Sequence, residues 1–123
     1  MKFRDHHHLA YCTNVHPAES WAETFEVIKT DVLAVRDRVA GGKAFAIGLR
    51  LSAQAATDLL TGDQLTEFET WLGKNKCYIF TINGFPYGAF HGTRVKEKVY
   101  QPDWTQPARL SYTEQLFTII DRL

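Results

Sequence analysis

Polar side chains with hydrogen-bonding chemistry follow or end three apolar segments of this sequence. Asn14 and His16 lie at the end of the first segment, Arg50 and Ser52 end the second, and Asn83 ends the third. An arginine guanidinium can form paired hydrogen bonds with a carboxylate or a phosphate, and an asparagine amide offers a donor and an acceptor to a sugar hydroxyl. These residue types predict a pocket for a small polar ligand. The alternative is that they only cap turns at strand ends, and the pattern leaves both interpretations open.

The segment 84–92, directly after the third apolar run, combines glycines with aromatic side chains. Glycine lets a backbone approach a ligand closely, and a ring such as that of Tyr87 can stack on the apolar face of a sugar. His91 and His16 are candidates for acid–base catalysis, but such a role needs a partner that the sequence does not reveal, and a structural hydrogen bond is the alternative for each. The candidate ligand-binding residues are Asn14, His16, Arg50, Asn83, Tyr87 and His91.

Hydrophobic periodicity predicts the elements that must position these side chains. Helical spacing of apolar residues runs from Trp21 to Val35, and Ser20 with Glu23 forms a capping-box sequence before it. Pro107 suits the first turn of a last helix, where its missing amide hydrogen costs nothing. The predicted strands cover about 9–15, 44–52 and 77–83, and the predicted helices about 20–40, 53–60, 63–74 and 107–123.

Side chains alternate between the two faces of a strand. In the second strand, alternation predicts a bulky face for covering helices, formed by Phe45, Ile47, Leu49 and Leu51, and a narrow face formed by Ala46, Gly48, Arg50 and Ser52. In the third strand it separates one set, Tyr78, Phe80 and Ile82, from another, Cys77, Ile79, Thr81 and Asn83. We expect the guanidinium of Arg50 at the strand ends, within reach of Asn14 or Asn83. The last helix carries Leu110, Phe117 and Ile120, which we take as its apolar face.

The order of elements predicts an α/β fold with parallel strands in βαβαβα order and right-handed crossovers. A flavodoxin-like sheet has helices on both faces, where Arg50 would be hard to bury. A barrel interior instead opens at the C-terminal ends of its strands, where the active sites of (β/α)8 enzymes lie. The polar strand ends therefore favour part of a TIM barrel, in a single domain over residues 1–123.

Composition excludes several classes of function. The chain has 123 residues with 14 basic and 14 acidic side chains, and this net charge of zero argues against nucleic acid as the main partner. No apolar stretch approaches the roughly 20 residues of a membrane span, and the first residues lack a secretion signal. Cys12 and Cys77 lie in apolar runs, which predicts two buried free thiols in a reducing compartment. We expect a cytoplasmic location.

Three segments carry a resemblance to a known family: residues 11–21, residues 47–52, and above all residues 81–92, continued through 95–104. Together they resemble the EboE-like metabolite-traffic proteins of the sugar phosphate isomerase/epimerase (xylose-isomerase-like) TIM-barrel superfamily. The similarity runs from about His8 to the last helix.

The resemblance implies a full-length barrel of eight βα units, of which this chain would hold the first three. In related isomerases the divalent metal is bound by Glu, Asp and His residues from the second half of the barrel. By this resemblance the chain itself has no cofactor, while Mn, Mg or Zn is possible in the full-length protein. The six candidate residues would line the first part of the barrel mouth.

Two functions follow as expectations. The first is the handling or trafficking of a small metabolite, such as a sugar, polyol or sugar phosphate, at the C-terminal mouth of the strands. The alternative is a metal-dependent sugar isomerase or epimerase whose metal site lies in the missing half, so that this chain alone is inactive. In either case we expect a small-molecule ligand, and self-association or pairing with the missing half through strand edges.

Overall fold

The computed structural model describes residues 1–4, 7–88 and 98–123. Its centre is a parallel sheet of three strands, β3 (Ala10–Cys12), β4 (Phe45–Arg50) and β5 (Cys77–Asn83), hydrogen-bonded in the order β3-β4-β5. The predicted α/β class with parallel strands is confirmed. A short antiparallel hairpin, β1 (Lys2–Phe3) with β2 (His7–His8), precedes the sheet and was not predicted from the sequence.

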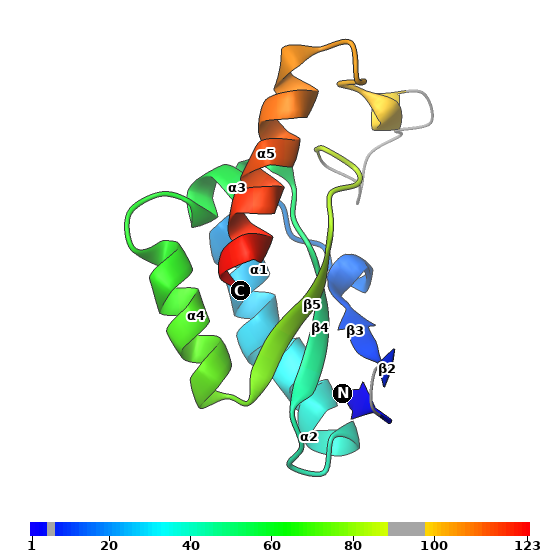
Figure 1. Ribbon diagram of the computed structural model, residues 1–123, viewed down its shortest axis with the longest axis vertical. Helices are drawn as coiled ribbons and strands as arrows, with labels where there is room; N and C mark the ends of the chain where they lie inside the picture. The colour runs from blue at the N-terminus through cyan, green and yellow to red at the C-terminus, as the bar shows by residue number, and fades with distance from the viewer. Residues whose placement is uncertain (5–6, 89–97) are drawn as a thin grey trace.

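The helices connect the strands much as the periodicity predicts. Figure 1 shows them gathered on one side of the sheet. They are α1 (Trp21–Val27), a π-helical segment η2 (Ile28–Val32), α2 (Leu33–Val39), α3 (Ala53–Leu59), α4 (Gln64–Lys74) and α5 (Pro107–Arg122). Two short 3-10 segments, η1 (Thr13–Val15) and η3 (Lys98–Tyr100), are separate from this group. The capping box forms as predicted, with the Ser20 hydroxyl accepting from the Glu23 amide and the Glu23 carboxylate accepting from the Ser20 amide. Within the described residues, no helix is long and apolar enough to cross a membrane.

The first strand ends earlier than predicted. Residues Thr13–Val15 form a 3-10 turn instead of continuing to residue 15. The buried hydroxyl of Thr13 accepts a hydrogen bond of 2.9 Å from the backbone N–H of Arg50, so a side chain takes the place of a ladder bond at the end of β4. The chain can therefore leave the sheet at this point without leaving the Arg50 amide unpaired.

The hydrophobic core lies between the sheet and the helices. Phe45, Ile47 and Leu49 of β4 point into it and are almost completely buried. They pack against apolar side chains of the helices, among them Trp21, Ile28, Val32, Leu59, Phe68, Leu72 and Ile119. The bulky face predicted for this strand is the helix-covered face.

The third strand contains an irregularity that strict alternation cannot predict. Its pairing with β4 passes from Ile47–Ile79 directly to Gly48–Thr81, so that Phe80 is the extra residue of a bulge. Beyond the bulge, Ile82 lies opposite Leu49 and Asn83 lies opposite Arg50. The predicted grouping of Asn83 with Cys77 and Ile79 is therefore wrong, because the extra residue reverses the faces of all that follow.

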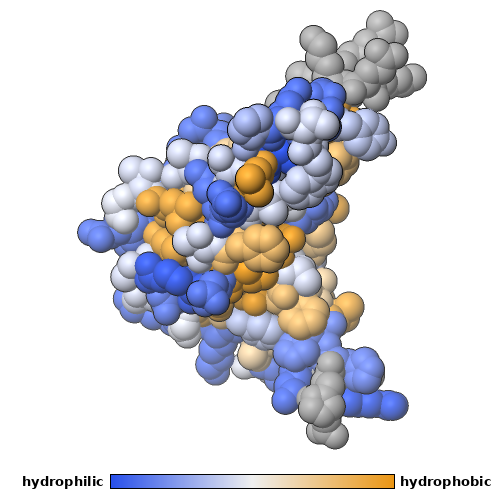
Figure 2. All heavy atoms as spheres, turned by 45° about the horizontal axis from the view of Figure 1, so that its top comes forward, coloured by the Kyte–Doolittle hydropathy of each residue, from blue (hydrophilic) through white to orange (hydrophobic). Residues whose placement is uncertain are grey.

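The last helix also corrects a prediction. Leu110, Phe117 and Ile120, taken from the sequence as its apolar face, are exposed, with Phe117 at 68%. The residues that face the core are Tyr112 and Ile119, with Leu116 partly buried beside them. Both sets recur at helical spacing, so periodicity alone could not choose between them. Figure 2 shows hydrophobic side chains gathered in the middle of the face that turns forward from the view of Figure 1.

The two cysteines differ in their surroundings. Both are free thiols, but only Cys77 is buried. Burial raises the pKa of the Cys77 thiol. Cys12 is exposed, contrary to prediction, because it lies opposite Gly48 on an edge strand and on the face without helices.

Candidate functional site

A groove of about 410 Å³ opens at the C-terminal ends of the strands, where the loops that follow β3, β4 and β5 meet. Its walls come from all three loops and from the start of α3. The lining residues are Glu19, Ser52, Ala53, Gln54, Thr57, Tyr87 and Gly88. A cavity of this size fits a small metabolite, since ligand pockets occupy roughly 300–1,000 Å³.

Arg50 holds this end of the sheet together. Its side chain is 6% exposed, and its Nη1 donates to the carbonyl oxygen of Ala18 at 2.7 Å and to Oε1 of Glu19 at 3.2 Å. Its Nη2 donates to the carbonyl oxygen of Gly88 at 2.9 Å. The guanidinium thus lies at the strand ends, as predicted, but its bonds go to loop carbonyls and one carboxylate and not to Asn14 or Asn83. Three of its five N–H donors serve the scaffold of the groove.

Ser52 and Glu19 fix the wall between the first and second loops. The Ser52 hydroxyl donates to the carbonyl oxygen of Glu19 and accepts from the backbone N–H of Ala55, which caps the start of α3. The Glu19 carboxylate remains partly exposed, at 37%, beside the guanidinium of Arg50. It is therefore available to accept hydrogen bonds from a ligand hydroxyl.

Tyr87 supplies the opposite wall. Its carbonyl oxygen accepts from the backbone N–H of Ala53 at 2.8 Å, and its ring packs edge-on against Tyr112 with ring centroids 5.0 Å apart. The Tyr87 hydroxyl has no hydrogen-bond partner among the residues that the structure describes. A positioned ring with an unpaired hydroxyl can both stack on a ligand and bond to it.

His16 lies outside the groove but has partners that the sequence did not reveal. Its Nε2 lies 2.9 Å from the hydroxyl of Tyr11, and its Nδ1 lies 3.4 Å from Oδ2 of Asp31. Asp31 belongs to the π-helical segment that follows α1. The contacts orient the imidazole between a phenol and a carboxylate, and they tie the first loop to the helix behind it.

The two asparagines form local contacts. Oδ1 of Asn83 accepts from the backbone N–H of Phe85 at 3.0 Å, and Oδ1 of Asn14 accepts from the Cys12 thiol at 2.9 Å. Both bonds span two residues and shape turns. Asn83 lies opposite Arg50 in the sheet register, whereas neither asparagine lines the groove.

Of the six predicted residues, Tyr87 lines the groove and Arg50 bonds to two of its lining residues, Glu19 and Gly88. Asn14, His16 and Asn83 do not line it. His91 is outside the described residues. Glu19 and Gln54 also line the groove, and neither was among the predicted residues. Glu19 stands in the first loop, one residue before the capping serine, and this position was the only signal that could have suggested it.

The groove offers several hydrogen-bonding groups and one charged side chain, that of Glu19. Glu19 offers a carboxylate, Gln54 an amide and Tyr87 a phenol, beside backbone groups of the loops. Among the residues with described positions, no group of three or more His, Cys, Asp or Glu side chains is arranged to hold a metal ion. These groups suit a neutral or cationic polar ligand better than an anion.

No protein-family model matches the chain, and no curated protein or solved structure shows significant similarity to it. Membership of the xylose-isomerase-like superfamily therefore stays a prediction, made from the resemblance of residues 11–21, 47–52 and 81–104.

Proposed function

We propose that this chain binds a small polar metabolite, such as a sugar or polyol, in the groove at the C-terminal ends of its strands, as part of a xylose-isomerase-like barrel. The role is that of a protein that handles or carries the metabolite. The observation that carries the proposal is the convergence of the loops after β3, β4 and β5 on one groove, tied together by Arg50.

The arrangement of the sheet supports a barrel segment. The three parallel strands are adjacent in chain order, and the helices lie on one face of them (Figure 1). The other face carries small residues on β4, Ala46 and Gly48, and leaves Phe80 of β5 43% exposed. A barrel has this organisation, with helices outside and a side-chain-lined interior, whereas doubly wound folds cover both faces with helices.

The groups in the groove support a hydroxylated ligand. A carboxylate such as Glu19 and an amide such as Gln54 bind hydroxyls through their oxygens, and an aromatic ring such as Tyr87 packs on the C–H face of a sugar. Arg50 already donates to three acceptors in the scaffold, so it is not free to serve as the main phosphate ligand. We therefore favour a neutral sugar or polyol over a sugar phosphate.

The proposal can be tested by NMR titration of the ¹⁵N-labelled chain with xylose, myo-inositol and ribose 5-phosphate. We expect saturable shifts of the Glu19, Gln54, Tyr87 and Gly88 amides with a neutral probe. Shifts scattered over the surface, or none with any of the three probes, would contradict binding in this groove. Parallel incubation of the chain with xylose and Mn²⁺ tests the isomerase alternative, because formation of xylulose would show turnover instead of binding alone.

A further inference from the structure

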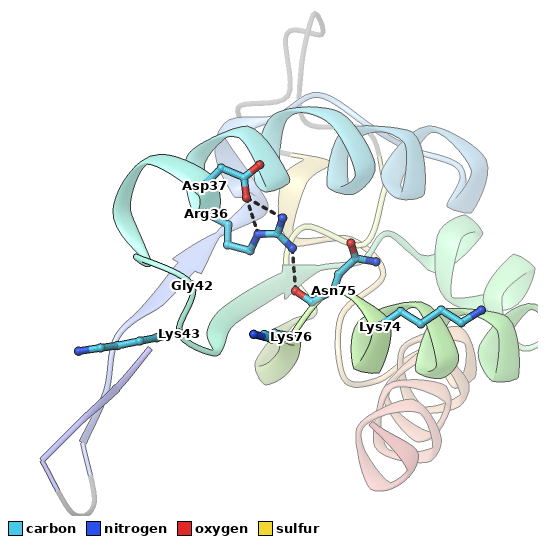
Figure 3. Close-up of a pocket in the computed structure, with 7 residues that line it drawn as sticks. All are labelled: Arg36, Asp37, Gly42, Lys43, Lys74, Asn75 and Lys76. Atoms are coloured by element: carbon cyan, nitrogen blue, oxygen red, sulfur yellow. Dashed lines mark hydrogen bonds and ion pairs between the residues drawn. The ribbon is translucent and has the colours of Figure 1, made fainter.

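A second cavity, of about 520 Å³, lies at the opposite end of the sheet from the groove. Figure 3 shows it between the last turn of α2, the turn that leads into β4 and the turn that joins α4 to β5. The residues that line it are Arg36, Asp37, Gly42, Lys43, Lys74, Asn75 and Lys76. The proposed metabolite site does not use any of them.

The cavity concentrates positive charge on a chain whose formal net charge is zero. Four of its lining side chains are cationic and one, Asp37, is a carboxylate, which leaves a formal excess of three positive charges. Lys43, Lys74 and Lys76 form no ion pair with any side chain in the described part of the protein. A concave surface with charge of one sign concentrates counter-ions from solution.

Arg36 pairs with Asp37, the carboxylate among the described residues that line the cavity. Its Nε and Nη2 donate to Oδ1 of Asp37 at 2.8 and 2.6 Å, and its Nη1 donates to the carbonyl oxygen of Asn75 at 2.7 Å. The hydrogen bond with Asp37 raises the pKa of Arg36. The neighbouring Cys77 thiol stays neutral, because burial raises its pKa. No side chain in the described part of the protein therefore neutralises the three lysines.

Cationic residues near helix C-termini also have a simple structural explanation, since they offset the helix dipole. The α2 and α4 C-termini both border this cavity. Each contributes the equivalent of about half a negative charge. Two such ends offset about one of the three excess positive charges, so dipole compensation alone does not account for the cluster.

We propose that this cavity binds a small polyanion that carries phosphoryl groups. Lysine ammonium groups bind phosphate as point charges, and a ligand with several negative charges can engage more than one of them. Gly42, at a φ of +77°, has open space around the position of a Cβ, so a ligand can approach this turn closely. In Figure 3 the side chains of Lys43 and Lys74 extend outward on opposite sides, and we expect rotation about their flexible stems to bring both ammonium groups onto the ligand.

The test is a titration of the ¹⁵N-labelled chain with pyrophosphate, with sodium chloride adjusted to hold ionic strength constant. We expect saturable shifts of the Gly42, Lys43, Lys74, Asn75 and Lys76 amides. The double variant Lys43→Gln/Lys76→Gln should weaken binding by about tenfold, since it removes two of the three unpaired positive charges that attract the ligand.

Two controls accompany it. The charge-preserving variant Lys43→Arg/Lys76→Arg should stay within about twofold of the wild-type affinity. Lys29→Gln, which removes a lysine paired with Glu26 outside the cavity, should leave binding unchanged. Shifts that rise linearly and spread over all lysines would overturn the proposal, as would wild-type affinity in the double glutamine variant. The dispersion of each variant's amide spectrum reports whether it has folded.

Discussion

The guanidinium of Arg50 donates a hydrogen bond of 2.9 Å to the carbonyl oxygen of Gly88, and so ties the end of β4 to the loop that follows β5. The same side chain donates to Ala18 and Glu19 in the loop after β3. One buried cation therefore positions the loops of all three parallel strands. The walls of the groove depend on it even though it does not line the groove itself.

This role predicts a large effect of Arg50→Gln on stability. A glutamine cannot reach three acceptors on two loops, and loop carbonyls such as that of Ala18 would lose their partner. We expect the free energy of unfolding to fall by about 3 kcal/mol, from the cost of leaving buried polar groups unpaired. Urea denaturation followed by circular dichroism measures it.

Arg50→Lys separates charge from geometry. Lysine keeps the positive charge but offers a single nitrogen. We therefore expect Arg50→Lys to retain less than half of the free energy of unfolding that Arg50→Gln loses. Lys29→Gln, at an exposed pair with Glu26, is the matched control and should change stability by less than about 0.5 kcal/mol. Equal stabilities of wild type and Arg50→Gln would show that the loops are held by other contacts.

Local sequence signals predicted much of the fold. The Ser20–Glu23 capping box specifies a helix start through hydrogen bonds within a few residues, and Pro107 specifies the start of α5 through its fixed φ and missing amide hydrogen. The bulge at Phe80 and the π-helical segment Ile28–Val32 carry no such local signal. Both depend on how two elements pair or pack, which a single sequence does not predict.

A pocket at the strand ends was predicted, and the groove lies there, but most of its lining residues and the partners of the predicted residues were not foreseen. The hydrogen-bonding capacity of Arg50 was evident from its residue type, but two of its three acceptors are backbone carbonyls, which every residue possesses. The sequence shows no partner for His16, because Asp31 is 15 residues away and reaches it through the folding of the helix that follows the loop. Long-range contacts of this kind depend on the packed structure.

The corrected face of α5 can be tested by two matched substitutions. Ile119 is fully buried and Phe117 is 68% exposed. We expect Ile119→Ala to lower the free energy of unfolding by about 3 kcal/mol, since it opens a cavity in the core. Phe117→Ala should change it by less than about 0.5 kcal/mol. The reverse order of the two effects in urea denaturation would restore the face predicted from the sequence.

The exposed apolar residues of α5 predict association of two copies of this chain. Leu110, Phe117 and Ile120 are all exposed on one helix, and such patches favour contact with another surface. Size-exclusion chromatography with light scattering should show a dimer that Phe117→Lys shifts towards monomer. Thr118→Lys, an exposed neighbour, is the control and should leave the dimer intact. A monomer at all concentrations would contradict the prediction.

Tyr112 predicts a dependence of stability on alkaline pH. Its hydroxyl donates to the carbonyl oxygen of Leu51, and burial raises its pKa to about 12. In the unfolded chain a tyrosine ionises near pH 10. The contribution of Tyr112 to the free energy of unfolding is therefore fully present below about pH 10. It declines by about 2–3 kcal/mol as the pH rises to about 12. The difference between wild type and Tyr112→Phe in urea denaturation should shrink over this range, and a constant difference would contradict the assignment.

The central claim, that the groove at the strand ends binds a small hydroxylated metabolite, is tested most directly by calorimetric titration of matched variants with the neutral probe that shifts the groove amides. Glu19→Gln and Tyr87→Phe change groups that line the groove, whereas Glu69→Gln and Tyr100→Phe change the same residue types elsewhere. We predict that each groove variant weakens binding by about tenfold, the loss of one or two ligand hydrogen bonds, and that neither control changes it by more than about twofold. Equal affinity in all four variants would contradict the account.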